Sequence, residues 1–422
     1  MRDFLKNNLI VLFLLNSASF FNYLFQFALG HSLSAAGFGS FNALNSLLAI
    51  LGAPVSIIHI IFSRFIVKLS VSSMGQVKSL FKKSFQIIIS IVAVIFIAGL
   101  LLIPWFKSFL HINETIPIVL MLISLGLSLL FPICFGMLEG LHRFLLFGIG
   151  SSGFTITRFI GALLLVTFLG LGVNGALLAG AIASCLALIF GFWSLRDIIK
   201  TPEENLHPDL WGEMVHFSMP VFLSTMMVMF LWNIDIVLVK HYCSEYESGL
   251  YATAAILGRI AFALPSTLLT VLFPSAAKIH AMGKKDDYIL WTSLGLTMVL
   301  AGSVALLFYF WPEQFIGLLF GEKFTEAAPL LQIISIAMAL LATSNVIFSY
   351  CLARSEFSYI WFLGAGVLLI LLLIILFHDS AMTIAIVLLF SVASIFVGTL
   401  IWLFFNLKRS ASMASNTKTL ES

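Results

Sequence analysis

Twelve apolar runs, each about 20 residues long, constrain the fold of this chain more than any other feature. A helix of that length and character crosses the hydrocarbon core of a bilayer. The runs lie near residues 9–29, 40–62, 85–104, 115–138, 145–169, 174–194, 215–239, 250–273, 288–310, 327–352, 359–377 and 382–405. The sequence therefore predicts an all-α polytopic membrane protein with twelve transmembrane helices in two six-helix bundles.

The composition excludes a soluble protein. Hydrophobic residues make up 61% of the chain and charged residues only 10%, whereas about 25% of a soluble domain is charged. No cluster of Lys and Arg of the kind that follows a nucleic-acid backbone is present, so we expect no nucleic-acid partner. The sequence also has no nucleotide-binding, zinc-protease or hydrolase motif, and its four cysteines form no CxxC pair. We therefore expect no enzymatic activity, no cofactor and no metal site.

The distribution of basic residues predicts the orientation in the membrane. If the N-terminus is cytoplasmic, the inner loops and termini hold 17 of the 22 Lys and Arg residues, and the outer loops hold Lys107, Lys240 and Lys323. The other two, Arg158 and Arg259, lie inside predicted spans. An excess of Lys and Arg marks cytoplasmic loops. We therefore expect both termini in the cytoplasm, and an uncleaved first span because no small-residue cleavage site follows it.

The polar segment 195–213 separates the two sets of six runs. We expect an N-terminal six-helix bundle at 1–194, a cytoplasmic linker at 195–213 and a C-terminal six-helix bundle at 214–405. The tail at 406–422 is rich in Ser, Thr and Lys, which predicts disorder.

A weak internal repeat relates the two halves. Ala36-Gly37-Phe38-Gly39 at the start of the second predicted helix resembles Ser248-Gly249-Leu250-Tyr251 at the start of the eighth. Each half has an even number of helices, so the chain enters both halves from the same side of the membrane. The two copies therefore have the same orientation, and a pseudo-two-fold axis along the membrane normal would relate them. The alternative is chance similarity among apolar segments.

Two charged residues lie at membrane depth on consecutive helices of the second half. Asp235 is on the seventh predicted helix and Arg259 on the eighth. A charge in a membrane span is costly unless it is paired or hydrated. One interpretation is a structural salt bridge. The other is that Asp235 binds H⁺ or Na⁺ during transport while Arg259 faces an anionic substrate.

Arg158 lies near the middle of the fifth predicted helix, which holds no acidic residue. An arginine at that depth must face protein or a water-filled cavity. Its planar guanidinium suits bidentate binding of phosphate, which makes it our preferred substrate contact. The alternative is a buried partner on another helix.

Polar side chains without charge give further cavity candidates. Asn22 and Gln26 on the first helix are four residues apart and share a helix face. They occupy the place in the first half that Asn233 and Asp235 occupy in the second. These residues would line the cavity or form hydrogen bonds between helices.

A family resemblance rests on the region that holds these charges. Asp235-Ile-Val-Leu-Val, Glu247-Ser-Gly249-Leu-Tyr251, Leu257-Gly-Arg259 and Leu272-Phe-Pro274, with Gly37-Phe-Gly39 in the first half, resemble the signature region of polysaccharide-exporter flippases. These are the Wzx-type O-antigen flippases of the multidrug/oligosaccharidyl-lipid/polysaccharide exporter (MOP) superfamily. The resemblance spans essentially the whole chain, but its motifs are diffuse and specify the superfamily more than a substrate.

The resemblance implies two bundles that move an undecaprenyl-pyrophosphate-linked oligosaccharide from the cytoplasmic to the periplasmic leaflet of a bacterial inner membrane. Arg158 and Arg259 would attract the pyrophosphate, and Asp235 would be the ion-coupling site. The chain has few intramembrane cations, so a strongly acidic glycan is less expected. The partners implied are the lipid-linked substrate, membrane lipids, a polysaccharide polymerase and a chain-length regulator.

Two other functions stay open. A multidrug or toxic-compound cation antiporter has the same fold, and an embedded acid suits it although two embedded arginines do not. A membrane polymerase or glycosyltransferase usually needs a large outer loop or domain, and the longest predicted outer loop here, about 311–326, is short.

Overall fold

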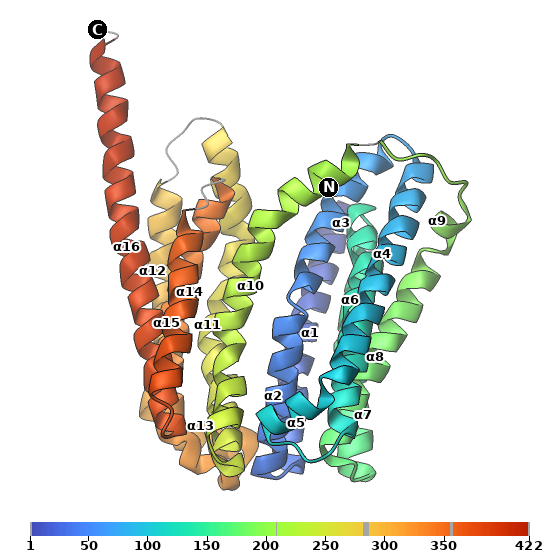
Figure 1. The fold of residues 1–422 in the computed structure, drawn as a ribbon. Coiled ribbons are helices and arrows are strands. Elements are labelled where there is room, and N and C mark those ends of the chain that lie inside the picture. Colours follow the sequence, from blue (N-terminus) through green and yellow to red (C-terminus); the bar gives the residue numbers. More distant parts are fainter. Residues whose placement is uncertain (1, 208, 282–286, 355–357, 421–422) are drawn as a thin grey trace. The chain divides into compact units, whose positions relative to one another are not determined.

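The computed structural model describes residues 2–207, 209–281, 287–354 and 358–420, and every regular element in these ranges is helical (Figure 1). Within them, 10 helices are long and apolar enough to cross a membrane. These are Met74–Leu101, Ile116–Gly140, Phe144–Phe168, Gly172–Ser194, Val221–Tyr242, Glu245–Pro265, Tyr288–Phe310, Glu322–Leu352, Tyr359–Leu376 and Ala381–Phe404. They coincide with the third to twelfth predicted runs. The prediction of a multi-pass all-α membrane protein is confirmed, and the number twelve stays a prediction.

The second predicted span, 40–62, is divided between two helices. Helix α1 (Arg2–Ser32) contains the first predicted span, and the chain continues as α2 (Ala35–Leu51) and α3 (Pro54–Ser70). The Gly52 N–H closes α2 with a 2.7 Å hydrogen bond to the Leu48 carbonyl. Proline has no N–H and its ring clashes with the preceding turn, so a new helix begins at Pro54.

The chain forms two compact units. Unit 1 consists of Met1–Ala252 and Leu319–Lys323, and unit 2 of Thr253–Leu318 and Phe324–Ser422. The chain therefore passes between the units at three points. The predicted division into bundles at 1–194 and 214–405 stays a prediction.

Unit 1 is built around α6 (Ile116–Gly140), which contacts α2, α3, α4 and α8. Of the apolar window of α6, 67% is buried, against 11% for α4 (Met74–Leu101). An apolar helix with an exposed surface faces lipid, so α4 lies at the lipid-facing side of the unit. The other helices are α5 (Ile103–Leu110), α7 (Phe144–Ala162) with the π-helix η1 (Leu163–Phe168), α8 (Gly172–Ser194), α9 (Arg196–Lys200), α10 (Leu210–Tyr242) and the start of α11 (Glu245–Ala281).

Unit 2 contains the rest of α11 and four further long helices. Helix α14 contacts α12 and α16, and α15 contacts α16. A short helix, α13, follows α12 as α5 follows α4, and each has a proline in its first turn. The elements are α12 (Asp287–Phe310), α13 (Pro312–Phe320), η2 (Glu322–Ala327), α14 (Ala328–Ala353), α15 (Tyr359–Leu376) and α16 (Ala381–Leu420).

The last helix extends into the predicted tail. Helix α16 continues to Leu420, and the disorder expected for 406–422 stays a prediction. No Gly or Pro interrupts residues 406–420, and Ala, Met, Lys and Leu all have good helix propensity. The polar composition of this segment is therefore compatible with a helix.

The two copies of the predicted repeat meet inside unit 1. Helix α2 begins after the N-cap Ser34, whose hydroxyl accepts a 3.1 Å hydrogen bond from a backbone N–H in the first turn of α2. Helix α11 begins after Ser244. A Cβ on Gly39 would lie 2.7 Å from the Gly249 nitrogen, and a Cβ on Gly249 would lie 2.6 Å from the Ala35 carbonyl carbon. Real Cβ atoms do not approach so closely, so these two glycines allow the helix starts to touch backbone to backbone.

The segment Leu319–Lys323 docks onto the end of α1 although it belongs to the second half of the sequence. The fully buried Phe320 ring lies 5.2 Å from the Phe27 ring and 5.6 Å from the Phe38 ring, both in edge-to-face geometry. The Lys323 Nζ donates to two backbone carbonyl oxygens, those of His31 at 3.1 Å and Leu33 at 2.7 Å. These bonds occupy carbonyls that the end of a helix leaves without partners.

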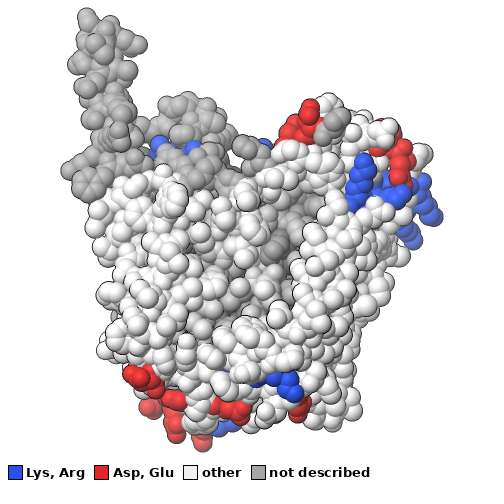
Figure 2. Space-filling view, in the orientation of Figure 1, with Lys and Arg blue, Asp and Glu red and all other residues white. Residues whose placement is uncertain are grey.

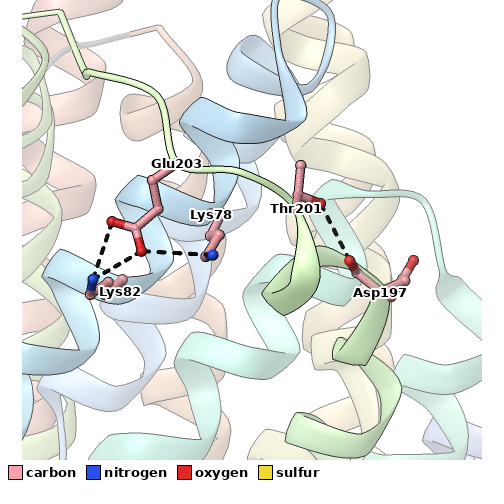
Figure 3. Close-up of polar contacts among 5 residues, drawn as sticks. All are labelled: Lys78, Lys82, Asp197, Thr201 and Glu203. Atoms are coloured by element: carbon pink, nitrogen blue, oxygen red, sulfur yellow. Dashed lines mark hydrogen bonds and ion pairs between the residues drawn. The ribbon is translucent and has the colours of Figure 1, made fainter.

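The predicted linker is fixed to the end of unit 1. Apolar side chains of this segment and of the start of α10 are buried in a cluster with α3, α4 and α6, namely Leu195, Ile198, Leu210 and Met214. The Glu203 carboxylate lies 2.9 Å from Lys82 Nζ and 3.7 Å from Lys78 Nζ, two lysines one turn apart on α4 (Figure 3). The linker is therefore an ordered strap across the end of α4.

Two more ion pairs hold the same strap. Arg143, at the α6–α7 turn, pairs with Asp197, and Lys68 Nζ lies 2.6 Å from the Glu213 carboxylate. The Arg143 hydrogen bonds lower the pKa of Asp197 to about 2, and the same bonds raise the pKa of Arg143. The Lys68 hydrogen bond lowers the pKa of Glu213. Each carboxylate is thus ionised over the physiological range.

The loops of unit 1 gather at its two ends as the topology predicts. The ion pairs join the α3, α4, α6–α7 and linker segments at one end. At the other end, the His241 ring in the last turn of α10 forms a 2.7 Å hydrogen bond with the Phe109 carbonyl of α5. On the face in view, the charged side chains also lie toward the ends and leave an uncharged band between them (Figure 2). Which end is cytoplasmic stays a prediction.

Candidate functional site

Arg158 lies on α7 inside unit 1, surrounded by uncharged partners. Its Nη2 donates a 2.8 Å hydrogen bond to the Asn45 Oδ1 of α2. Its guanidinium carbon lies 4.1 Å from the centre of the Phe25 ring of α1, within the range of a cation–π interaction. No ion pair to Arg158 is found among the described Asp and Glu residues. The arginine is therefore held by an amide and an aromatic face.

A cavity of about 70 Å³, lined by apolar and polar side chains, lies beside this guanidinium. The Arg158 Nε and the Ser124 hydroxyl are both buried and have no hydrogen-bond partner among the described residues. The walls come from α2, α6, α7 and α8, and include Phe41, Asn45, Ser124, Ser128, Phe154 and Ser184. Several hydrogen-bond donors therefore converge on a space large enough for water or a small anion.

Small residues bring α7, the helix that holds Arg158, close to α8. A Cβ on Gly161 would lie 3.1 Å from the Ala179 Cβ of α8. One turn after Arg158 the helix widens into the π-helix η1, and π segments occur often at functional sites. Arg158 thus lies just before a close helix contact and a local irregularity of the helix.

The two first-helix candidates differ in burial. Gln26 is 8% exposed and its Oε1 has no hydrogen-bond partner within the described ranges, whereas Asn22 is exposed. Phe25, next to Gln26, is the residue whose ring lies against Arg158. Their proposed role in the cavity stays a prediction.

The candidates on α10 are buried. Asn233 Nδ2 donates to the Met229 carbonyl of its own helix at 2.9 Å. Asp235 is 1% exposed, and its Oδ2 accepts a 3.0 Å hydrogen bond from the Tyr251 hydroxyl of α11. Arg259 lies further along α11 in unit 2, and its predicted pairing with Asp235 stays a prediction.

Sequence reasoning did not select Asn45, Ser124 or Tyr251 as members of these sites. Asn45 and Ser124 are polar residues inside predicted apolar runs, which is a usable signal because polar side chains in spans usually face the protein interior. Tyr251 lies in the quoted signature region, but nothing in the sequence indicates that its hydroxyl bonds Asp235. These contacts depend on which helices pack together.

Solved structures show the same fold at low sequence identity. The chain is similar to the "inward-facing conformation of a multidrug resistance MATE family transporter of the MOP superfamily", with a TM-score of 0.76, 12% identity, and 94% of this chain and 96% of that chain covered. It is also similar to the "Lipid II flippase MurJ, inward closed conformation", with a TM-score of 0.69, 16% identity, and coverages of 94% and 87%.

A third similar structure is a MOP superfamily transporter from Pyrococcus furiosus, whose title states that a reverse polarity of the binding pocket suggests a different function. Its TM-score is 0.65, with 12% identity and coverages of 96% and 95%. At these identities the likeness shows the fold. The expected MOP architecture is therefore confirmed.

Sequence comparison identifies the family. No curated protein matches the sequence. Residues 5–280 match the family described as "Polysaccharide biosynthesis protein". This match covers more than half of the 422 residues, including all of unit 1 except Leu319–Lys323 and the first four residues. The chain belongs to the polysaccharide biosynthesis protein family.

Proposed function

We propose that this protein is a flippase for an undecaprenyl-pyrophosphate-linked oligosaccharide, such as an O-antigen or other surface-polysaccharide repeat unit. Family membership supports a role in polysaccharide biosynthesis. The fold, shared with MATE transporters and a lipid II flippase, supports translocation by alternating access and no enzymatic step. The proposed direction is from the cytoplasmic to the periplasmic leaflet of a bacterial inner membrane, with both termini cytoplasmic.

The observation that carries the proposal is the buried Arg158 with uncharged partners. The first 194 residues contain only three acids, Asp3, Glu114 and Glu139, and none lies in the interior of a predicted span. A guanidinium with an unpartnered Nε beside a cavity favours an anionic group, because a charge-assisted hydrogen bond to phosphate is stronger than a neutral one. A cationic drug would be repelled from the same position.

The size of the cavity adds a requirement. At about 70 Å³ it is too small for a sugar diphosphate. Contact between Arg158 and the substrate therefore requires the packing of α2, α6, α7 and α8 to open during the cycle. Alternating access supplies such a second conformation.

We assign the other candidates roles in the same cycle. Arg259 would provide a second cation for the pyrophosphate, and Asn22, Gln26 and Asn233 would contact the glycan hydroxyls. Asp235, which is buried and hydrogen-bonded to Tyr251, would take up H⁺ or Na⁺. A polysaccharide polymerase and a chain-length regulator would act on the product at the outer leaflet.

The alternative in the same fold is a cation antiporter, and the buried acid Asp235 is the observation that favours it. Purified protein in vesicles separates the two functions. Fluorescently labelled polyprenyl-pyrophosphate glycan should become accessible to a membrane-impermeant quencher in the opposite leaflet, whereas a cationic dye should not be transported against a pH or Na⁺ gradient.

Protein-free vesicles provide the background rate of lipid exchange. Dye transport without glycan-lipid movement would overturn the proposal and support the antiporter. Polymerisation or sugar transfer by the purified protein would instead indicate the enzymatic alternative.

A further inference from the structure

A second hollow region of unit 1 lies on its surface, between α3, α4 and the first turns of α10. It consists of two adjoining grooves of about 340 and 500 Å³. Ile87, Ile91 and Trp211 line both. The combined surface is referred to below as the α3–α4–α10 groove. It is distinct from the Arg158 cavity, with which it shares no lining residue.

The groove is apolar and open at its side. Its deeper part is lined by α3, α4 and α10 side chains, namely Ile58, Ile61, Phe62, Ser84, Ile87, Ile88, Ile91, Trp211, Met214, Val215 and Ser218. Ile87 is 48% exposed and Val215 is 63% exposed. The helix that forms its floor, α4, is the lipid-facing helix of the unit. The groove is therefore open to the bilayer along its length.

Polar groups lie at one end of this groove. Lys83 and Gln86 line the shallower part on the same face of α4. The Ser84 hydroxyl is buried in the wall of the deeper part and has no hydrogen-bond partner in the portion of the chain that is described. From Lys83 to Ile91 the floor runs about 12 Å along α4, at about 1.5 Å per residue. A cation and an unpartnered hydroxyl thus lie on consecutive residues of α4 beside the apolar groove.

Lys83 differs from the lysines around it. Lys82 and Lys78 both contact the Glu203 carboxylate (Figure 3). Lys68 contacts Glu213. Lys83 is exposed and forms no ion pair with any described residue. The linker therefore neutralises its neighbours and leaves the lysine at the groove available to an anion.

We propose that the α3–α4–α10 groove binds the polyprenyl chain of a polyprenyl-diphosphate lipid, with Lys83 against the diphosphate. This inference rests on the proposed function, because it assigns a binding place to the lipid part of that substrate. The charges are complementary: an anionic head group beside a single uncompensated lysine, and an apolar chain along the isoleucines of α3 and α4.

The lining of the groove favours an apolar chain. Five isoleucines line it and offer a polyprenyl chain a continuous apolar surface along α3 and α4. The positively charged end of the groove coincides with the end of unit 1 predicted to be cytoplasmic, where the substrate is made available.

Photocrosslinking tests the occupant directly. A diazirine amino acid replaces Ile87 inside the groove, and in a matched protein it replaces Ile89, which is 46% exposed on α4 but lines neither part of the groove. Full-length protein is irradiated in vesicles that contain polyprenyl-diphosphate glycan and excess phosphatidylglycerol. Mass spectrometry should find the polyprenyl adduct enriched at least tenfold at position 87 over position 89.

Binding measurements test the role of the lysine. By native mass spectrometry, Lys83→Gln should bind polyprenyl diphosphate about tenfold more weakly, which corresponds to the loss of one charge-assisted contact. Lys82→Gln should keep the affinity of the unmodified protein, because Lys82 already pairs with Glu203. Both lysines are exposed, so the variants should fold alike, and thermal unfolding checks this.

The outcomes separate this inference from the proposed function. Only phospholipid adducts at position 87, equal adducts at 87 and 89, or equal weakening by the two lysine variants would overturn the groove assignment. If the same protein still moves the labelled glycan lipid between leaflets, the flippase proposal stands alone. If it neither moves nor binds that lipid, both proposals fail.

Discussion

At the scale of single residues, Arg158 shows how a membrane protein holds a cation without an acid. One hydrogen bond donated to Asn45 and the face of Phe25 replace part of the water that the guanidinium loses. Its depth and the absence of an acid on its helix were evident from the sequence. Asn45, Phe25 and Ser124 come from three other helices, so no pattern along the chain could identify them as its neighbours.

Substitution of Arg158 tests the proposed contact with pyrophosphate. Arg158→Lys keeps the charge but loses the planar fork, so transport of the glycan lipid should fall by about tenfold. Arg158→Gln should reduce transport by about a hundredfold, the loss expected when two charge-assisted hydrogen bonds disappear. The measurement is the initial rate of glycan-lipid movement per folded protein in vesicles.

Arg196→Gln is the matched control, because Arg196 lies in the linker with its guanidinium 5.3 Å from the Trp193 ring, outside the spans. It should transport normally. A well-accumulated Arg158→Gln protein with a normal rate would remove Arg158 from the substrate path.

Asp235 and Arg259 carry a second prediction, which separates a structural bridge from an ion-coupling role. If the pair forms only a bridge, the exchange of Asp235→Arg with Arg259→Asp should restore much of the transport lost by either single change. We expect the exchanged protein to fold but remain inactive, because a coupling acid must stay in its place beside Tyr251. Full recovery of transport, measured in the same vesicle assay, would refute the coupling role.

At the scale of elements, the positions where helices begin and meet were partly predictable. Pro54 ends the regular α2 helix because proline lacks an N–H, and this signal is local. The contact between the starts of α2 and α11 is not local. The sequence showed two similar Gly-containing segments, and only the fold shows that Gly39 faces the Gly249 backbone and that Gly249 faces the Ala35 backbone.

This contact predicts that a residue larger than glycine at position 249 destabilises the protein. In Gly249→Ala the new Cβ would meet the Ala35 backbone, which is less able to move than a side chain, so we expect a loss of about 1–3 kcal/mol of stability. Gly153→Ala in α7 is the control, since no atom lies within 4 Å of its Cβ position. It should be neutral or stabilising by up to about 1 kcal/mol. Thermal unfolding in detergent should rank the two proteins, and equal stability would contradict the described contact.

The linker strap makes a pH-dependent contribution. The pKa of Asp197 is lowered to about 2 by its hydrogen bonds to Arg143, so the folded state holds this carboxylate ionised more strongly than the unfolded state does. Its stabilising effect is complete above the unfolded pKa of about 3.9 and is lost as the pH falls toward 2. Asp197 is largely exposed, so solvent screening limits the effect to less than about 1 kcal/mol.

Thermal unfolding of the unmodified protein and of Asp197→Asn measures this contribution. The difference in melting temperature should be constant from pH 7 to pH 5 and should shrink between pH 4 and pH 2. A difference that grows on acidification would have the wrong sign for a carboxylate with a lowered pKa.

At the scale of the whole molecule, composition and the apolar runs predicted a multi-pass helical protein correctly. The helix contacts within the units could not be predicted in this way. The apolar runs indicate where spans lie, but they do not indicate that α10 packs on α2 and α3, or that Leu319–Lys323 docks on α1. Such partnerships arise from the shapes of side chains on separate helices, which periodicity does not record.

Reporter fusions test the predicted topology. A reporter that is active only in the cytoplasm should be active when fused after Lys83 or Thr201. A reporter that is active only outside the cytoplasm should be active when fused after Gly39, Ser244 or Gly321. Paired reporters that fluoresce or fold on opposite sides of the membrane provide the measurement. One fusion site that reports the side opposite to its prediction would refute the arrangement of twelve spans.

The docking of Leu319–Lys323 also has a consequence for how the protein is made. Chains grow from the N-terminus, and completed portions fold while synthesis continues. Because Phe320 and Lys323 form part of unit 1, that unit stays incomplete until residue 323 has left the ribosome and reached the end of α1. Until then Phe27 and Phe38 lack the Phe320 ring that packs against them, so the first half of the chain alone cannot complete the packing of its own unit.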